Sequence, residues 1–290
     1  MSISGGLKLM GADGGATRLQ WMRANVAQYF SLFRRKPTPS SMPAWRSPLR
    51  LGVGAAIAIV IIAATMIVID AAAVPVAQGV PEWLITVFDE ITDFGKSVWF
   101  LVPIALFLAA LALVASPALP LMSRRVVAAI AVRLGFLFLA IGLPGLCFAA
   151  VKRLIGRARP LVEGGADPFI YRPLGWNVEY ASLPSGHSTD AFAAAMAIGA
   201  LWPRARPFMW TYAVVIAVSR VVLTAHFPSD VVLGAIIGVV GALLVRDWFA
   251  TRRLAFAYGG DGSVRPFAGP SLARIRRIAR QLVAAPEARK

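Results

Sequence analysis

The 290-residue chain contains only two histidines, and each lies in a short polar cluster beside a long apolar run. His187 follows Ser185 and Gly186, and His226 precedes Asp230 by four residues. Residues four apart on a helix share a face, so a carboxylate at 230 can lie beside one ring nitrogen of His226. Such a contact fixes the tautomer and leaves the other ring nitrogen free to attack phosphorus.

Cationic side chains at the ends of other apolar runs suit the binding of a phosphoryl group. Lys152 and Arg159 follow one run, and Arg220 lies near the end of another. Arginine presents a planar fork that matches phosphate oxygens, whereas lysine acts as a point charge. Ser185 and Gly186 open an apolar run, so the N-terminus of a helix there would also point at the anion, and the glycine lets the backbone approach closely.

The elements that must position these side chains are membrane helices. Hydrophobic residues make up 58% of the chain, and the mean hydropathy is +0.69. The apolar residues are gathered in runs of about 18 residues or more, long enough to cross a bilayer. The sequence predicts six spans, at about 51–72, 98–122, 126–152, 186–203, 207–225 and 229–249.

Lysine and arginine are distributed unevenly between the two sides of this predicted topology. Six spans put both termini on one side, which carries 22 of the 30 basic residues, whereas the opposite loops carry six. The positive-inside rule makes the basic side the cytoplasm. The candidate residues would then lie on the opposite side, which is the periplasmic face of the inner membrane in a bacterium-like cell. The same pattern accounts for the net charge of +16, so we expect no nucleic-acid partner.

The spacing of the polar clusters resembles the motifs of the type 2 phosphatidic acid phosphatase (PAP2) superfamily, membrane lipid phosphatases related to the vanadium haloperoxidases. The family's three motifs are present in order and without a departure. They read Lys152-RLIGRA-Arg159-Pro160, Pro184-Ser185-Gly186-His187 and Ser219-Arg220-VVLTA-His226-FPS-Asp230.

The resemblance implies an all-α, polytopic membrane enzyme with six transmembrane helices and a haloperoxidase-like helical core. It implies that His226 is the nucleophile, that Asp230 is its partner, and that His187 protonates the leaving lipid alcohol before water hydrolyses the phosphohistidine. The family positions that would hold the phosphoryl oxygens are Lys152, Arg159, Ser185, Gly186 and Arg220. Two histidines and scattered carboxylates do not form a metal-ligand cluster, so we expect a metal-independent hydrolase without a cofactor.

This interpretation divides the chain into a basic cytoplasmic N-terminal segment, 1–50, a six-helix membrane phosphatase domain, 51–250, and a basic cytoplasmic tail, 251–290.

Family resemblance offers several lipid substrates: undecaprenyl pyrophosphate, lipid A 1-phosphate, phosphatidylglycerol phosphate and phosphatidic acid. The sequence leaves open the choice among them and the oligomeric state. It also leaves open whether phosphate passes to water or, in a phosphotransferase, to a lipid or sugar hydroxyl. A catalytically silent transporter or scaffold is a third hypothesis, which the intact motifs disfavour.

Three amphipathic segments lie outside the predicted spans. Apolar residues recur at helical spacing in 19–33, which indicates either a helix on the membrane surface or a partly disordered tail. Residues 81–97 are expected to form an interfacial helix between the first two spans, and 272–282 a second surface helix near the C-terminus.

Several single residues carry further expectations. Cys147 lies inside an apolar run and is expected to be buried. Asp190, one turn after His187, either interacts with the dipole at the start of its helix or lines the pocket. Three arginines that belong to no motif are expected to contact headgroups or solvent: Arg153, Arg157 and Arg172.

Overall fold

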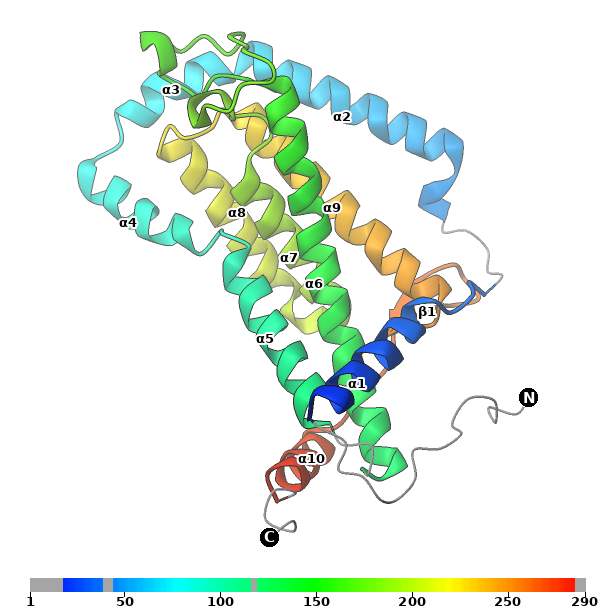
Figure 1. Cartoon of the computed structure of the whole chain (residues 1–290). Helices are drawn as coiled ribbons and strands as arrows, with labels where there is room; N and C mark the ends of the chain where they lie inside the picture. The colour runs from blue at the N-terminus through cyan, green and yellow to red at the C-terminus, as the bar shows by residue number, and fades with distance from the viewer. Residues whose placement is uncertain (1–17, 39–43, 116–118, 285–290) are drawn as a thin grey trace.

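The computed structural model describes residues 18–38, 44–115 and 119–284, and the chain over these ranges is mostly helical (Figure 1). The α-helices are α1 Arg18–Phe33, α2 Pro48–Val68, α3 Asp70–Gln78, α4 Glu82–Asp93, α5 Val98–Val114, α6 Leu121–Ile155, α7 Gly186–Leu201, α8 Arg206–Val222, α9 Pro228–Thr251 and α10 Leu272–Ala284. Short 3-10 helices are η1 Ala44–Arg46, η2 Val162–Gly164, η3 Val178–Tyr180 and η4 Pro203–Ala205. An antiparallel hairpin of β1 Phe256–Tyr258 and β2 Val264–Pro266 follows α9. The all-α prediction did not include this hairpin.

Helix α7 is the centre of the bundle, packed against α6, α8 and α9. Its buried faces consist largely of alanine, so neighbouring helices approach closely. A Cβ added to Gly238 of α9 would lie 2.3 Å from the carbonyl oxygen of Thr189 in α7. Small residues permit such close backbone packing within a membrane. This contact fixes the N-terminal ends of α7 and α9 relative to each other, where His187 and Asp230 lie.

Helices form at all six predicted span positions, and several of them are long enough to cross a bilayer. Among the described residues, four stretches have the required length and hydropathy: Pro48–Val68, Glu82–Leu113, Leu121–Ile155 and Pro228–Thr251. Helices α7 and α8 have 16 and 17 residues, and at about 1.5 Å per residue they fall short of a hydrocarbon core of about 30 Å. The structure thus confirms a mostly helical chain with helices long and apolar enough to cross a membrane, whereas six crossings and the three-part division of the chain stay predictions.

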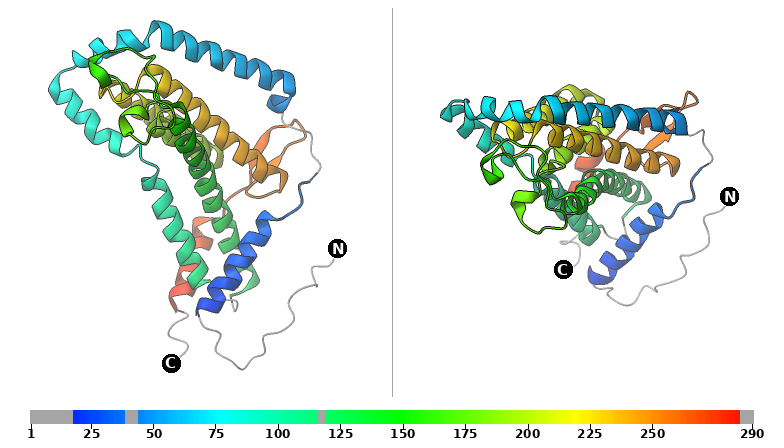
Figure 2. Two further views of the ribbon diagram at one scale, coloured as in Figure 1. Left: turned by 45° about the horizontal axis from the view of Figure 1, so that its top comes forward. Right: turned by 90° about the horizontal axis from the view of Figure 1, so that it is seen from above.

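The two ends of the bundle carry different elements (Figures 1 and 2). Helices α3 and α4 and the loop 156–185 lie at one end, whereas α1, α10 and the hairpin lie at the other. At the second end, Tyr29 of α1 and Ile278 of α10 belong to one small apolar cluster with α6. Of the two expectations for 19–33, the helix is the one that forms, and it packs on α5.

Helix α2 and part of α6 present their apolar side chains outward. Figure 2 shows α2 beside α9, and only 6% of its span is buried. Cys147 in α6 is exposed, so the expectation of a buried cysteine was wrong. An apolar run in a membrane protein can face lipid tails as well as the protein interior, because both are apolar.

Candidate active site

Five segments bring the predicted site residues to one end of the bundle. Lys152 lies in the last turn of α6, and Arg159 follows in the loop. His187 is the second residue of α7, Arg220 lies in the last turn of α8, and Asp230 lies in the first turn of α9. Electrostatic interactions connect these side chains across the segments, so the structure does bring together residues that are far apart in the sequence.

His226 is buried, and its Nδ1 faces the carboxylate of Asp230 through a hydroxyl group. The distance from Nδ1 to Asp230 Oδ2 is 3.7 Å, which is too long for a direct hydrogen bond. Ser182 Oγ donates to Asp230 Oδ2 at 2.6 Å and lies 3.4 Å from His226 Nδ1. Because the single Ser182 proton goes to the carboxylate, its oxygen can only accept from the ring. Nδ1 therefore carries the ring proton, and Nε2 keeps its lone pair.

The electrostatic surroundings keep His226 neutral. The pKa of His226 is lowered to about 4, mainly by burial. The positive charges of Arg220 and Arg159 also lower this pKa, whereas Asp230 raises it. At neutral pH the imidazole therefore carries no charge. The neutral ring is the nucleophilic form, so His226 is ready to attack without first losing a proton.

Three buried nitrogen atoms near His226 have no hydrogen-bond partner among the described residues: Arg159 Nε, His187 Nε2 and Arg220 Nε. Buried polar groups are normally satisfied. Lys152 interacts with the like charges of Arg159 and Arg220, and its Nζ lies 5.5 Å from the Phe148 ring centre. A ligand with negative charge and several acceptor oxygens would satisfy this set, and phosphate has both properties.

The N-terminus of α7 contributes backbone donors to the same region. Ser185 is the N-cap, and its extended backbone is fully buried, with its N–H donating to the carbonyl of Asp230 at 3.0 Å. A Cβ on Gly186 would lie 2.7 Å from the Phe148 ring, so position 186 has little room for a side chain. The first turn of a helix leaves N–H groups unpaired by the helix itself, which favours an anion there.

Helix α4 reaches the site and does more than rest at the interface. Thr92 Oγ1 is buried and accepts from Arg220 NH1 at 2.8 Å and from Ser219 Oγ at 2.9 Å. The turn after α4 covers His187, since a Cβ on Gly95 would lie 3.1 Å from its Cδ2. Thr92 was not predicted as a site residue, because nothing in the apolar pattern of α4 shows which helix it packs against. Helix α4 thus orients one of the predicted phosphate ligands.

A buried ion cluster lies behind Asp230. Arg157 is completely buried; its NH1 donates to Asp230 Oδ1, and its NH2 donates to Asp70 Oδ2 at 2.7 Å. The expectation that Arg157 contacts headgroups or solvent was wrong, because two carboxylates balance its charge inside the protein. Asp70 was missed, although it is the sole ionisable residue between 51 and 78. An ionisable residue in an apolar run is a signal of function.

The other residues that the sequence singled out surround the site without entering the ion cluster. Arg153 stacks on the Trp176 ring at 5.3 Å, and Arg172 pairs with Glu163 at 2.6 Å on the exposed loop. One carboxylate oxygen of Asp190 accepts from the backbone N–H at the bend before α5, at 3.2 Å. The other oxygen is buried without a partner in the described part of the chain.

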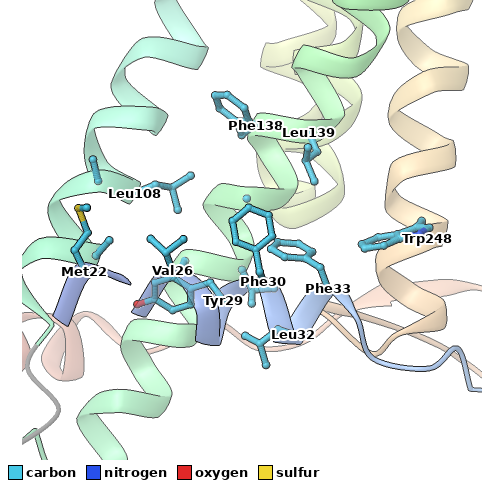
Figure 3. A pocket seen from close by; sticks show the side chains of 15 residues that line it. Met22, Val26, Tyr29, Phe30, Leu32, Phe33, Leu108, Phe138, Leu139 and Trp248 are labelled. Atoms are coloured by element: carbon cyan, nitrogen blue, oxygen red, sulfur yellow. The ribbon is translucent and has the colours of Figure 1, made fainter. Parts of the chain in front are cut away.

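A large apolar cavity lies at the opposite end of the bundle (Figure 3). It measures about 600 Å³ and lies between α1, α5 and α6, lined by Phe30, Phe33, Leu108 and Phe138 and closed on one side by Trp248. None of the described residues that line it is a histidine, a carboxylate or a cation, so these residues offer no group for phosphoryl chemistry. Across the described ranges, no group of three or more His, Cys, Asp or Glu side chains is placed to hold a metal ion.

Comparison with known sequences finds relatives of the segment that holds the site. Residues 133–254 match the sequence model of the PAP2 superfamily. The chain is 36% identical over 127 residues to a lipid A 1-phosphatase of Rhizobium johnstonii and 35% identical over 127 residues to one of Rhizobium etli. Each alignment covers 44% of this chain, and they cover 52% and 55% of the relatives. The chain thus spans about half the length of the curated relatives it matches.

Two solved structures show a more distant likeness. The crystal structure of Aquifex aeolicus LpxE has a TM-score of 0.42 and 22% identity, covering 58% of this chain and 88% of that chain. The first transmembrane PAP2 type phosphatidylglycerolphosphate phosphatase from Bacillus subtilis has a TM-score of 0.41 and 20% identity, covering 79% of this chain and 95% of that chain. Scores of this size do not by themselves establish a shared arrangement of helices.

Proposed function

We propose that this chain is a membrane lipid phosphatase in which His226 carries the phosphoryl group during turnover, because residues 133–254 match the sequence model of the PAP2 superfamily. One observation carries the proposal. Within the described part of the chain, Arg159 Nε, Arg220 Nε and His187 Nε2 are buried without partners, beside a neutral imidazole whose Nε2 is free to attack. A phosphoryl group is the ligand that such a set would bind and react with.

In the proposed first step, His226 Nε2 attacks phosphorus and the bond from phosphorus to the lipid oxygen breaks. The phosphate anion bound beside His187 favours the protonated ring. His187 gives this proton to the departing oxygen, so the lipid leaves as an alcohol. The phosphorylated ring keeps its Nδ1 proton and becomes cationic, and Ser182 and Asp230 stabilise that charge. Arg159 and Arg220 neutralise the charge that develops on the phosphoryl oxygens.

In the second step, water attacks the phosphohistidine. His187, now neutral, takes a proton from that water as the bond between Nε2 and phosphorus breaks. Inorganic phosphate leaves, and His226 returns to its neutral form. The two steps need no electron carrier, and protons balance because His187 alternates between acid and base.

Among lipid substrates, we propose the 1-phosphate of lipid A. Support comes from the two relatives, both named lipid A 1-phosphatase, whose identity of about 35% extends over 127 residues. Undecaprenyl pyrophosphate, phosphatidylglycerol phosphate and phosphatidic acid are the comparison substrates for the assay. Their phosphate groups offer the same oxygens to the site, so the rest of the lipid must decide preference.

We also propose that the site faces the periplasm. The basic residues predicted to be cytoplasmic include those of α1 and α10, and both helices lie at the end opposite the site (Figure 1). By the positive-inside rule this end is cytoplasmic. A reporter enzyme that is active only in the periplasm, fused to the C-terminus, should stay silent. A strong signal from it would contradict this orientation.

The proposed activity is tested with purified protein in detergent and the four lipids, each without an added acceptor. The wild type should release inorganic phosphate, and His226→Ala should lower turnover by several orders of magnitude, about the loss seen when other covalent nucleophiles are removed. Arg172→Ala, on the exposed loop, is the matched control and should retain activity. Phosphate release only after addition of a lipid or sugar alcohol would indicate a phosphotransferase instead. Near-normal turnover by His226→Ala would refute the phosphohistidine.

A further inference from the structure

We propose that Arg157 and Asp70 are positioning residues that hold Asp230, and through it His226, in the reactive arrangement. This inference rests on the proposed function and extends it to two residues outside the three motifs. Arg157 stands between the motif residues Lys152 and Arg159, whereas Asp70 comes from α3, which no motif covers. Neither side chain reaches the surface, so neither can serve as a headgroup contact.

Arg157 uses all three guanidinium nitrogens on different partners. Its Nε donates to the carbonyl of Pro168 at 2.9 Å, and its NH2 donates to Asp70. Its NH1 donates to Asp230 Oδ1 and to Ser229 Oγ. The guanidinium also lies over the Phe227 ring, 4.5 Å from its centre. Lysine, with one nitrogen, cannot reproduce this fork.

Asp70 supports the same short segment from the opposite side. Its Oδ1 accepts from the backbone N–H of Ser229 at 2.9 Å, and its Oδ2 accepts from Ser229 Oγ and from Arg157. Ser229 lies in the first turn of α9, directly before Asp230. The carboxylate of Asp70 therefore fixes the backbone that carries Asp230, in addition to pairing with Arg157.

The contacts of Asp230 divide between the two sides of its carboxylate. Oδ1 accepts from Arg157, while Oδ2 accepts from Ser182 and from the backbone N–H of Phe227 at 2.9 Å. Ser182 is the group that lies against His226 Nδ1. Arg157 thus holds the side of the carboxylate that faces away from the imidazole, which leaves Oδ2 turned toward it.

Charge balance makes Arg157 necessary in this arrangement. Asp70 and Asp230 are both fully buried carboxylates, and Arg157 is the cation that pairs with each of them. Removing that cation leaves two buried negative charges close together, which is strongly unfavourable. One carboxylate would then take up a proton or rotate toward another donor. Either change would remove the ionised, oriented Asp230 that fixes the His226 tautomer.

The cluster does not contain the three nitrogens of the site that lack a partner among the residues that the structure describes, Arg159 Nε, Arg220 Nε and His187 Nε2. Its loss should therefore slow the chemical step and leave lipid binding largely intact. Outer-shell partners that orient metal-binding histidines typically contribute about 10- to 100-fold, and we expect a similar range for partners that orient a nucleophilic histidine. We expect Arg157→Met to lower kcat about 10- to 100-fold, with KM changed by less than about threefold, as for a group that acts in the transition state only.

A double substitution separates positioning from a general loss of structure. Arg157→Met leaves two buried carboxylates, whereas Arg157→Met with Asp70→Asn leaves one, which restores the net charge of the wild-type cluster. The double variant should fold and should recover part of the kcat lost in Arg157→Met. Arg172→Ala, which removes an exposed arginine of the same loop, should keep wild-type kcat and KM.

Nitrogen-15 NMR of histidine gives a readout that does not depend on turnover. The chain has two histidines, so the signals that remain in the spectrum of His187→Ala belong to His226. In the wild type, the His226 signal should show a protonated Nδ1 and a bare Nε2. In Arg157→Met it should shift toward a mixture of tautomers, and the double variant should move it back.

The inference is overturned if folded Arg157→Met keeps the wild-type His226 signals and kcat, or if the double variant merely adds the two single losses. A wild type that releases no phosphate from any lipid counts against the proposed function instead. In that case the histidine spectra of the same variants still decide whether Arg157 positions His226.

Discussion

Replacement of Gly238 by alanine tests how the packing of α7 against α9 controls the site. A Cβ at position 238 would lie 2.3 Å from the carbonyl oxygen of Thr189 and 2.9 Å from the backbone nitrogen of Ala193. Both atoms belong to the backbone of α7, so neither can move aside by a change of rotamer. The two helices must separate by about 1 Å to reach ordinary van der Waals contact.

The expected loss of stability follows from two opposing contributions. Overpacking in a tight core costs about 1–3 kcal/mol, and a backbone clash belongs at the upper end of this range. Alanine in place of glycine within a helix returns about 1 kcal/mol. The net loss is therefore about 2 kcal/mol, which corresponds to a decrease in Tm of about 4–8 °C in a protein of this size.

The same displacement of the helices should reduce activity by more than the loss of stability alone would. Thr189 lies two residues after His187, and Gly238 lies eight residues after Asp230. Moving α7 and α9 apart therefore changes the position of His187 relative to the His226–Asp230 pair. A misplacement of about 1 Å can cost about 100-fold in rate.

Thermal unfolding in detergent and phosphate release from lipid measure the two effects on one preparation. Gly52→Ala in α2 is the matched control, because a Cβ there meets nothing within 4 Å, and it should melt at or slightly above the wild-type temperature. Gly238→Ala with wild-type Tm and full activity would refute the idea that this contact sets the site geometry.

Two further predictions concern the nucleophile. Since burial lowers the pKa of His226 to about 4, its nitrogen-15 signals should titrate near pH 4 instead of near the usual value of about 6.5, and a midpoint above 6 would contradict the burial argument. The direction of this pKa shift also predicts that the free energy of unfolding decreases as the pH falls from about 6.5 toward 4, because His226 binds a proton more readily in the unfolded chain. Ser182→Ala should lower kcat about 10- to 100-fold with little change in KM, because it removes the hydroxyl between His226 and Asp230; unchanged kcat would show that this hydroxyl has no part in the reaction.

The positions and types of the main helices could be predicted from the sequence, because long apolar runs have one structural solution in a bilayer. The break between α2 and α3 at residue 69 could not, since the apolar run 51–72 continues through it without a helix-breaking residue. The α9–β1 turn and the hairpin were likewise not predicted. Their short strands depend on contacts with each other and with α9, which no local pattern shows.

For the candidate site, the sequence alone determined the chemical types: two imidazoles, the cations around them, and a carboxylate four residues after His226. These follow from local spacing, because each cluster belongs to one turn of helix or one short loop. The tertiary structure decided that Arg157 turns inward and that Ser182 stands between His226 and Asp230. It also decided that Asp70, 87 residues from Arg157, completes the ion cluster. Burial and charge pairing depend on which segments pack together, and that information is shared among distant parts of the chain.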